Sequence, residues 1–221
     1  MKMSMKSVIT LIAVAAPSFA FAAAYDIDAA HSSADFSVKH MMVSNVKGNF
    51  KVKSGTINID DKDVTKSTVE AVLDATTVNT AEPKRDEHLK SPDFFDTAKY
   101  PTITFKSTKV AKAGKDKLKV TGDLTMHGVT KPVVLDVVGP TPEIKDAFGG
   151  MRRGVEATTK LNRKEFGLGW NKALEAGGVA VGEDISIVLA LELTPKKDAA
   201  AAPAAPAAPA APAAPAAKGT K

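Results

Sequence analysis

The chain has 221 residues, of which 44% are hydrophobic and 25% are charged, and its formal net charge is +5. This length suits one domain of ordinary composition. There is no cysteine, so disulfides and thiolate metal sites are excluded and the fold must rest on its own core. The lysines are scattered and aromatic residues make up only 5% of the chain, so no nucleic-acid partner is expected.

The first residues have the three parts of a secretory signal peptide. Two lysines precede an apolar run over residues 8–16, and small residues follow in "AFAAA". The run is too short to cross a bilayer, which takes roughly 20 apolar residues. We therefore expect residues 1–24 to be a signal peptide, cleaved between Ala20 and Tyr25, and the mature protein to be periplasmic. Without a cysteine for lipid attachment, no permanent membrane anchor is expected.

The end of the chain is of low complexity. Residues 198–221 are mostly alanine and proline, with a proline at every third position from Pro203 to Pro215. This spacing breaks helices and favours an extended, semi-rigid spacer. We expect a disordered tail, which leaves residues 25–197 as a single domain.

Most of that domain alternates between apolar and polar residues, which is typical of half-buried strands. In "KLKVTGDLTM" the apolar parity is predicted to face inward: Leu118, Val120, Leu124 and Met126. The polar parity is predicted to face outward: Lys117, Lys119 and Thr121. Similar alternation recurs at 34–38, 50–59, 67–78, 101–107, 131–138, 154–162 and 184–193.

Eight such segments without alternating helices predict an all-β protein with an antiparallel eight-stranded β-barrel, or else a sandwich. Closure into a barrel has the advantage that it removes exposed strand edges. The alternation shifts by one residue at Ser54 and Gly55, which predicts a β-bulge there.

The segment "RDEHLKSPDFFDTAKYP", residues 85–101, interrupts the strand pattern. Its first part can form about two helical turns, with Arg85, His88 and Leu89 on one face and Asp86 paired with Lys90. This predicts a short helical insert at one end of the barrel.

The second part of the insert has the signals of another helix start. Ser91 has the position of an N-cap, followed by Pro92 and Asp93 in a first turn. Phe94 and Phe95 come next. We expect this insert to cover the end of the barrel as an aromatic lid.

Six motifs, in this order, resemble those of the YceI-like family of exported polyisoprenoid-binding proteins: "YDIDAAHSSADFSVKH", "VKGNF", "RDEHLKSPDFFD", "YPTITF", "TGDLTMHGVTKPV" and "LNRKEFGLGW". They span nearly all of residues 25–193, and the Ala/Pro tail departs from the family pattern. The resemblance implies an extended lipocalin-like barrel with an elongated apolar cavity. It also implies an amphiphilic ligand such as a polyprenyl pyrophosphate or a quinone.

The candidate ligand-binding residues are Arg85, His88, Phe94, Phe95, Phe36, Phe105 and Arg163. Because a guanidinium can bond two phosphate oxygens at once, Arg85 beside His88 is a candidate for binding a polar head group. Alternatively, these two residues form a salt bridge and a cap that pin the insert to the barrel. Arg163 is a second head-group candidate, and its alternative is a pairing with Glu165 or Asp86.

Catalysis and metal binding find little support. The four histidines, His31, His40, His88 and His127, lack the close spacing of metal ligands, so no metal or cofactor is expected. A triad of Asp28, His31 and Ser32 or Ser33 is disfavoured, because triad members normally converge from separate elements.

The sequence therefore favours a periplasmic carrier, not an enzyme, that holds an isoprenoid lipid or quinone inside the barrel. Two alternatives stay open. One is an envelope structural or stress-related accessory protein with a packed barrel. The other is an accessory enzyme of isoprenoid or quinone metabolism. The sequence leaves open the identity of the lipid, its donor and acceptor, and the oligomeric state, a homodimer included.

Overall fold

The computed structural model describes residues 22–175 and 177–196. Almost all of the expected signal peptide, residues 1–24, and the whole of the expected tail, residues 198–221, lie outside the described residues. Within the described part there are ten strands, one α-helix and two short 3-10 helices. The strands are β1 (Ala23–Ile27), β2 (Ser33–His40), β3 (Ser44–Ile59), β4 (Thr68–Asn79), β5 (Thr102–Gly114), β6 (Lys117–Met126), β7 (Val129–Val138), β8 (Ile144–Lys145), β9 (Met151–Asn162) and β10 (Val181–Pro195). The helices are α1 (Pro83–Lys90), η1 (Val64–Lys66) and η2 (Arg163–Phe166).

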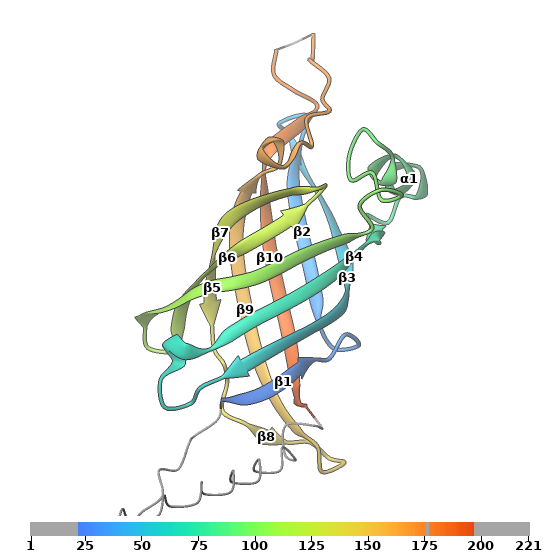
Figure 1. The fold of residues 1–221 in the computed structure, drawn as a ribbon. Helices are drawn as coiled ribbons and strands as arrows, with labels where there is room; N and C mark the ends of the chain where they lie inside the picture. Colours follow the sequence, from blue (N-terminus) through green and yellow to red (C-terminus); the bar gives the residue numbers. More distant parts are fainter. Residues whose placement is uncertain (1–21, 176, 197–221) are drawn as a thin grey trace, which may run out of the picture.

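Eight of the strands close into an antiparallel barrel, which confirms the predicted fold class (Figure 1). The order around the barrel is β2, β3, β4, β5, β6, β7, β9 and β10, and β10 pairs back with β2. The strand β1 was not predicted. It pairs with β3 and β10 beyond the end of β2, with Tyr25 opposite Ile57 and Pro195.

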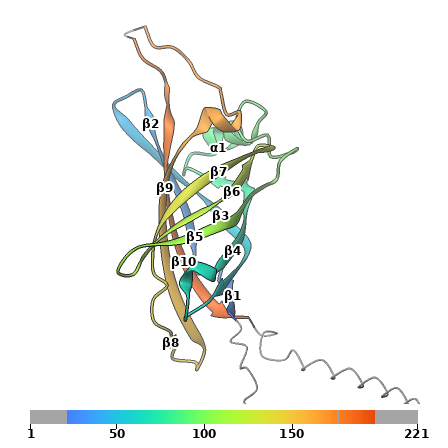
Figure 2. The ribbon, with the colours of Figure 1, turned by 60° about the vertical axis from the view of Figure 1, so that its left-hand side comes forward.

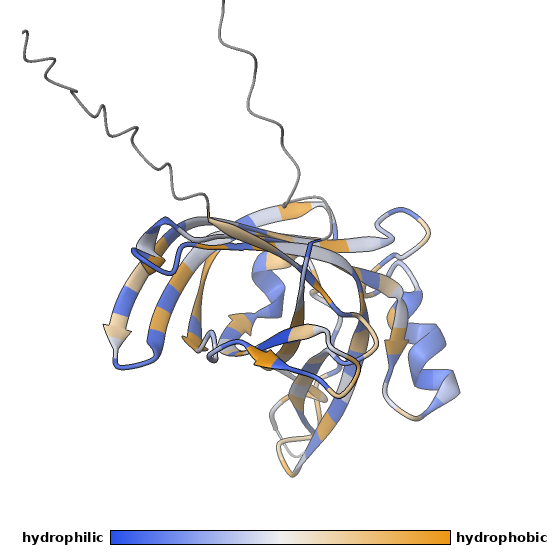
Figure 3. Ribbon diagram, turned by 90° about the horizontal axis from the view of Figure 1, so that it is seen from below, coloured by the Kyte–Doolittle hydropathy of each residue, from blue (hydrophilic) through white to orange (hydrophobic). Residues whose placement is uncertain are grey.

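The inward parity predicted for residues 117–126 is confirmed. On β6, Leu118, Val120 and Met126 are buried, whereas Lys117 and Lys119 are exposed. Figure 3 shows the same alternation of apolar and polar residues along the other strands. The apolar parity of the barrel wall therefore faces the lumen.

The predicted bulge on β3 is also present. Val52 pairs with Leu73 and Ser54 pairs with Val72, so Lys53 is an extra residue in the ladder. The extra residue keeps the apolar residues on both sides of the bulge on the inner face, as their burial shows.

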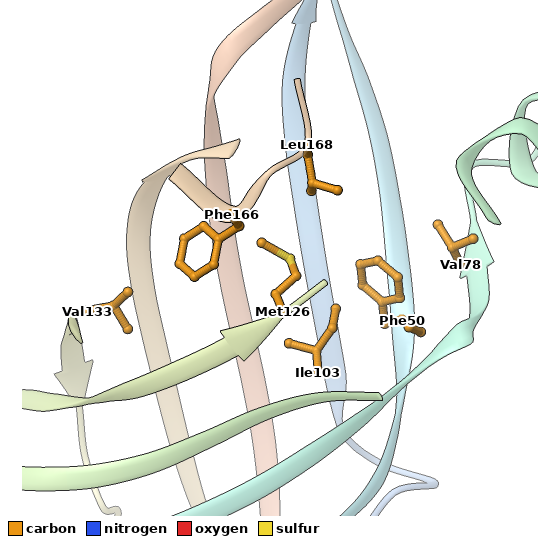
Figure 4. Packing of buried hydrophobic residues seen from close by; sticks show 8 residues of the cluster. Phe50, Val78, Ile103, Met126, Val133, Phe166 and Leu168 are labelled. Carbon is orange, nitrogen blue, oxygen red and sulfur yellow. The ribbon is translucent and has the colours of Figure 1, made fainter. Parts of the chain in front are cut away.

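The barrel has two differently built ends (Figures 1 and 2). We call the end that carries α1, the β2–β3 turn and η2 the lid end, and the end that carries β1, η1 and β8 the base end. Figure 4 shows apolar side chains converging at the lid end, with Phe166 beside Met126 and Leu168 above Met126 and Phe50. A second cluster closes the base end around Leu193, which is fully buried.

The insert between β4 and β5 contains the predicted first helix but not the second. The helix α1 starts after Glu82 and ends at Ser91. Residues 91–99 form successive turns, so the predicted second helix start is wrong. The reason is local: the Ser91 hydroxyl donates 2.8 Å to the carbonyl of His88 and so closes α1.

The predicted pairing of Asp86 with Lys90 is wrong as well. Asp86 Oδ1 accepts hydrogen bonds from the backbone N–H and the hydroxyl of Thr80, at 2.8 and 2.6 Å. Lys90 pairs instead with Glu87. Asp86 therefore fixes the turn that leads from β4 into α1.

No helix in the described ranges combines the length and the apolar character needed to cross a bilayer.

We expect Gly122→Ala to destabilise the barrel by about 1–3 kcal/mol, the usual cost of overpacking. A Cβ at position 122 would overlap the ring of Phe105 and lie 2.6 Å from the backbone oxygen of Lys106. Urea unfolding measures the loss. The control is Gly169→Ala, since a Cβ there meets nothing within 4 Å, and it should change stability by no more than about 0.5 kcal/mol. Equal effects of the two substitutions would show that the inner wall tolerates the extra methyl group.

Candidate functional site

The barrel encloses an apolar cavity of about 240 Å³ that extends from the lid end to the base end. Lining residues at the base end include Ile27, Ile59 and Val64. Lining residues at the lid end include Leu89, Phe95 and Leu168. A space of about 10–15 Å³ already holds one water molecule. This cavity is much larger, and with so few polar groups it offers water few partners.

Small inward residues keep the middle of the lumen open. Ala71 and Ala157 line the cavity, as their parity predicts, whereas Ala75 is buried in the lid-end cluster. Glycines provide further room: a Cβ on Gly48 would lie 2.5 Å from the Phe36 ring. The ring of Phe36 therefore lies against the wall, and Phe105 does the same at Gly122.

Aromatic rings from the insert and the wall meet at the lid end. The ring of Phe95 makes an edge contact with Phe50 at 5.2 Å between centroids, and Phe50 lies 5.4 Å from Phe36. Phe94, Phe95, Phe36 and Phe105 all line the cavity. Four of the seven predicted site residues are therefore aromatic residues that face the lumen.

A second aromatic group fastens the insert to the loop that follows η2. His88 makes edge contacts with both Phe94 and Trp170, each at 5.0 Å between ring centroids. Trp170 was not among the predicted site residues, although it ends the motif "LNRKEFGLGW". Its position as the single tryptophan of a chain poor in aromatics was the available signal.

His127, in the β6–β7 turn, also ties lid-end segments together. Its Nδ1 lies 3.2 Å from the carbonyl oxygen of Phe166, so this nitrogen must carry the hydrogen. Its ring contacts Tyr100 at 5.0 Å. This hydrogen bond joins the β6–β7 turn to η2, 39 residues further along the chain.

Arg163 is a buried cation at the cavity wall. Its Nε donates 2.8 Å to the carbonyl of Gly182, and its two terminal nitrogens donate to the carbonyls of Leu168 and Val181. The predicted alternative, pairing with Glu165 or Asp86, is wrong. Within residues 22–175 and 177–196 no carboxylate lies within ion-pair distance of Arg163.

The direct partners of Arg163 are thus three carbonyl dipoles, and the nearest carboxylate to act on it, that of Glu183, lies beyond ion-pair distance. Burial lowers the pKa of its guanidinium, because a low-dielectric surrounding disfavours the charged form. The nearby Glu183 opposes this shift, but its carboxylate bonds Lys164 directly. An arginine remains protonated under such a shift. Arg163 is therefore the one cationic residue of a mostly apolar lining, which also includes Asp35 and the hydroxyl residues Ser67, Thr104 and Thr159.

Arg85 and His88, in contrast, are not among the residues that line the cavity. Arg85 donates 2.7 Å to the hydroxyl and 2.9 Å to the carbonyl of Thr80. His88 Nε2 lies 2.9 Å from the Asp93 carboxylate. These contacts resemble the pinning arrangement that the sequence left open, and a ligand contact for either residue stays a prediction.

A polar cluster lies at the base end, where one ligand atom each from Asp28, His31 and Glu192 lies within 4.8 Å of the others. Arg152 Nε lies 3.3 Å from the Glu192 carboxylate and supplies a positive charge of its own. The Ser32 hydroxyl accepts a hydrogen bond from the backbone N–H of Glu192. These contacts connect the segment before β2 and the strand β9 to Glu192 on β10.

The hydrogen bond to Asp28 raises the pKa of His31 and lowers that of Asp28. We expect a ¹H NMR titration to give His31 a pKa above the ordinary value of about 6.5. Because the folded-state pKa is raised, this pair stabilises the fold fully below the unfolded pKa and loses its effect as pH rises through the folded pKa.

The variant His31→Asn should therefore be less stable than the unsubstituted protein at pH 5 and nearly equal to it at pH 9. A stability difference that grows with increasing pH would contradict this pairing.

A closed antiparallel barrel with a lidded apolar lumen defines a class of β-barrel proteins with an internal cavity. Residues 25–193 match the YceI-like domain, and the chain belongs to the YceI-like family.

Three known proteins illustrate the similarity. A UPF0312 protein of Vibrio parahaemolyticus is 44% identical over 170 residues, which cover 75% of this chain and 88% of that protein. The crystal structure of a YCEI protein from Campylobacter jejuni has a TM-score of 0.59 at 32% identity, over 72% of this chain and 90% of that one. A polyisoprenoid binding domain from Saccharophagus degradans has a TM-score of 0.55 at 17% identity, over 79% and 99% of the two chains. At that identity the last similarity shows the fold alone.

Proposed function

We propose that the protein is a periplasmic carrier that holds one long amphiphilic isoprenoid, a polyprenyl pyrophosphate, a quinone or a similar lipid, inside the barrel. The observation that carries the proposal is the apolar cavity of about 240 Å³ that spans the barrel. Its elongated course suits a chain-like ligand better than a compact one.

The energetic cost of an empty cavity supports a bound ligand. At roughly 24 cal/mol per Å³, a void of this size would cost on the order of 6 kcal/mol, which is comparable to the net stability of a whole domain. The glycines that seat Phe36 and Phe105 against the wall enlarge the space instead of filling it. A protein whose barrel served only as a structural core would gain stability from larger side chains there.

In the proposed complex, the lid end binds the polar part of the ligand. Arg163 is the one cationic group in the cavity lining, and two of its five N–H groups are not needed for its three carbonyl bonds. Phe94 and Phe95 enclose the neck of the ligand, and Phe36 and Phe105 contact its chain. This assigns head-group recognition to Arg163 before Arg85.

Two further points support the proposal. The solved domain of Saccharophagus degradans is described as polyisoprenoid binding, and it shares this fold. The N-terminal sequence has the parts of an export signal, which supports a periplasmic location.

The first test is mass spectrometry of an organic extract of the purified protein, followed by return of a polyprenol to the extracted protein. We expect an isoprenoid in the extract and a higher melting temperature after the polyprenol is added, because a ligand that binds only the folded state stabilises it. An empty extract together with an unchanged melting temperature would favour the packed structural barrel. Chemical conversion of the lipid during incubation would favour the accessory enzyme.

A matched pair of variants tests where the ligand lies. Ala157→Leu adds bulk to the lumen, whereas Thr158→Leu adds the same side chain to the exposed outer face of β9. We expect the first variant to bind polyprenol at least about tenfold more weakly, a loss of about 1.4 kcal/mol, and the second to bind normally. Tryptophan fluorescence titration measures both affinities. Normal binding by both variants would place the ligand outside the barrel.

The head-group assignment is tested with a polyprenyl phosphate and its matching polyprenol. Arg163→Met removes the charge and retains most of the volume, so it should weaken the phosphate by about tenfold more than the alcohol, the scale of one charge-assisted hydrogen bond. Arg85→Met is the control and should leave the ratio of the two affinities unchanged. A changed ratio in the Arg85 variant alone would transfer head-group recognition to Arg85. Equal affinities of the unsubstituted protein for both ligands would exclude a charged head-group site.

A further inference from the structure

The turn between β2 and β3 presents three consecutive apolar side chains to solvent at the lid end. Met41 is 46% exposed, Met42 is 55% exposed and Val43 is 81% exposed. The hairpin projects from the lid end beside the loop that follows η2 (Figures 1 and 2). We call residues 41–43 the apolar tip. Contiguous apolar residues that are exposed to solvent commonly mark a site of interaction with a partner or a membrane.

The backbone of the tip does not explain this choice of residues. Met41 and Met42 have φ angles of 49° and 62°, and the Val43 N–H donates to the carbonyl of His40 at 3.1 Å. The β-turn formed by residues 40–43 has positive φ at both central positions and therefore favours Asn-Gly, because a Cβ atom is strained in this left-handed region. The turn therefore retains two methionines against its local conformational preference, and such strain points to function.

The strands below the tip carry positive charge without acidic neighbours in sequence. Residues 36–59 contain four lysines and no aspartate or glutamate. Lys39 and Lys47 stand nearest the tip and are exposed, and neither forms an ion pair with any residue that the structure describes. The adjacent loop contributes Lys172 and Glu175, whose charges cancel.

The tip is also connected to the wall of the cavity. The Met41 N–H donates 2.8 Å to the carbonyl of Ala180, and the next residue along the chain, Val181, lines the cavity and accepts from Arg163. A few residues before the tip, Phe36 and Val38 line the same cavity. A surface bound by the tip would therefore lie directly against the lid end.

We propose that the apolar tip, flanked by Lys39 and Lys47, docks the lid end reversibly on an anionic phospholipid bilayer. Three apolar side chains reach the boundary between head groups and acyl chains, and the lysines face the anionic head groups. Methionine suits this role because its unbranched, flexible side chain can adapt to the irregular packing of lipid head groups and acyl chains. The docking itself is independent of the ligand. Its use, to pass an isoprenoid between membrane and lumen without exposure to water, rests on the proposed function.

The decisive variant is Met41→Asn/Met42→Gly, which gives the turn the residues that its backbone favours and removes two of the three apolar side chains of the tip. It should fold with an equal or higher melting temperature. Flotation with vesicles of phosphatidylethanolamine and phosphatidylglycerol should show at least about tenfold weaker binding than the unsubstituted protein, the loss expected when the buried apolar area is removed. Vesicles of phosphatidylcholine alone should bind both proteins weakly.

Two controls at the base end match the changes at the tip. Phe148 is 99% exposed, so Phe148→Ser removes an exposed apolar side chain as the tip variant does, and it should leave flotation unchanged.

The lysines beside the tip are tested separately: Lys39→Gln/Lys47→Gln should weaken binding by about fivefold for each lysine at low salt. The same neutralisation in the β5–β6 turn, Lys115→Gln/Lys117→Gln, should have little effect.

The proposal is overturned if the unsubstituted protein does not float with the anionic vesicles, or if the Asn-Gly variant floats equally well. It is also overturned if Phe148→Ser is the variant that abolishes flotation. A tip variant that instead changes the oligomeric state in size-exclusion chromatography would assign the tip to a contact between copies of this chain. Polyprenol binding by the same proteins, measured in detergent, separates membrane docking from the carrier function. If the protein binds polyprenol but does not dock on vesicles, the docking inference is contradicted and the carrier function is not.

Discussion

The structure depends on the double pairing of β10, which hydrogen-bonds to β9 on one side and to β2 on the other. Because of this closure, the apolar side chains of all eight strands face one common lumen. A one-residue shift in the pairing register of a strand would turn its apolar side chains outward. The strands are long, up to 16 residues in β3, so the lumen is long as well. Whether such a lumen is packed or hollow is then decided by side-chain size alone.

The segments of the lid end are held together by side-chain contacts and not by the backbone hydrogen bonds of a β-sheet. Arg163 joins η2 to the start of β10 through three carbonyl oxygens, and His127 joins the β6–β7 turn to Phe166. Trp170 and His88 complete the connection to the insert. A buried cation that bonds only carbonyl oxygens retains an excess of positive potential, whereas one paired with a carboxylate would not. This is the physical basis on which the proposed function assigns head-group recognition to Arg163.

The sequence predicted the parts of the fold that follow from local periodicity. Alternation placed Leu118 and Val120 inside the barrel, and the parity shift at Ser54 and Gly55 predicted a bulge that the structure has one residue earlier, at Lys53. It could not predict the partners of Arg163 or Asp86, because these are backbone carbonyls and a threonine brought close by the chain path. The same limit applies to the site. Of the rings that line the lumen, Phe36 and Phe105 could be chosen by strand parity. The pinning of Arg85 to Thr80 depends on a turn geometry that composition does not specify.

The glycines at positions 48 and 122 give the lumen an unusual mechanical property. At each position a phenylalanine ring occupies the space that a Cβ atom would fill, so the width of the lumen there depends on the absence of that atom. A Cβ atom added at either position would overlap the ring, so the ring would have to move. A change of one methyl group in the wall would thus be amplified into the displacement of a six-membered ring. The free width of the lumen beside these two rings therefore depends on two backbone positions as well as on the aliphatic side chains around them.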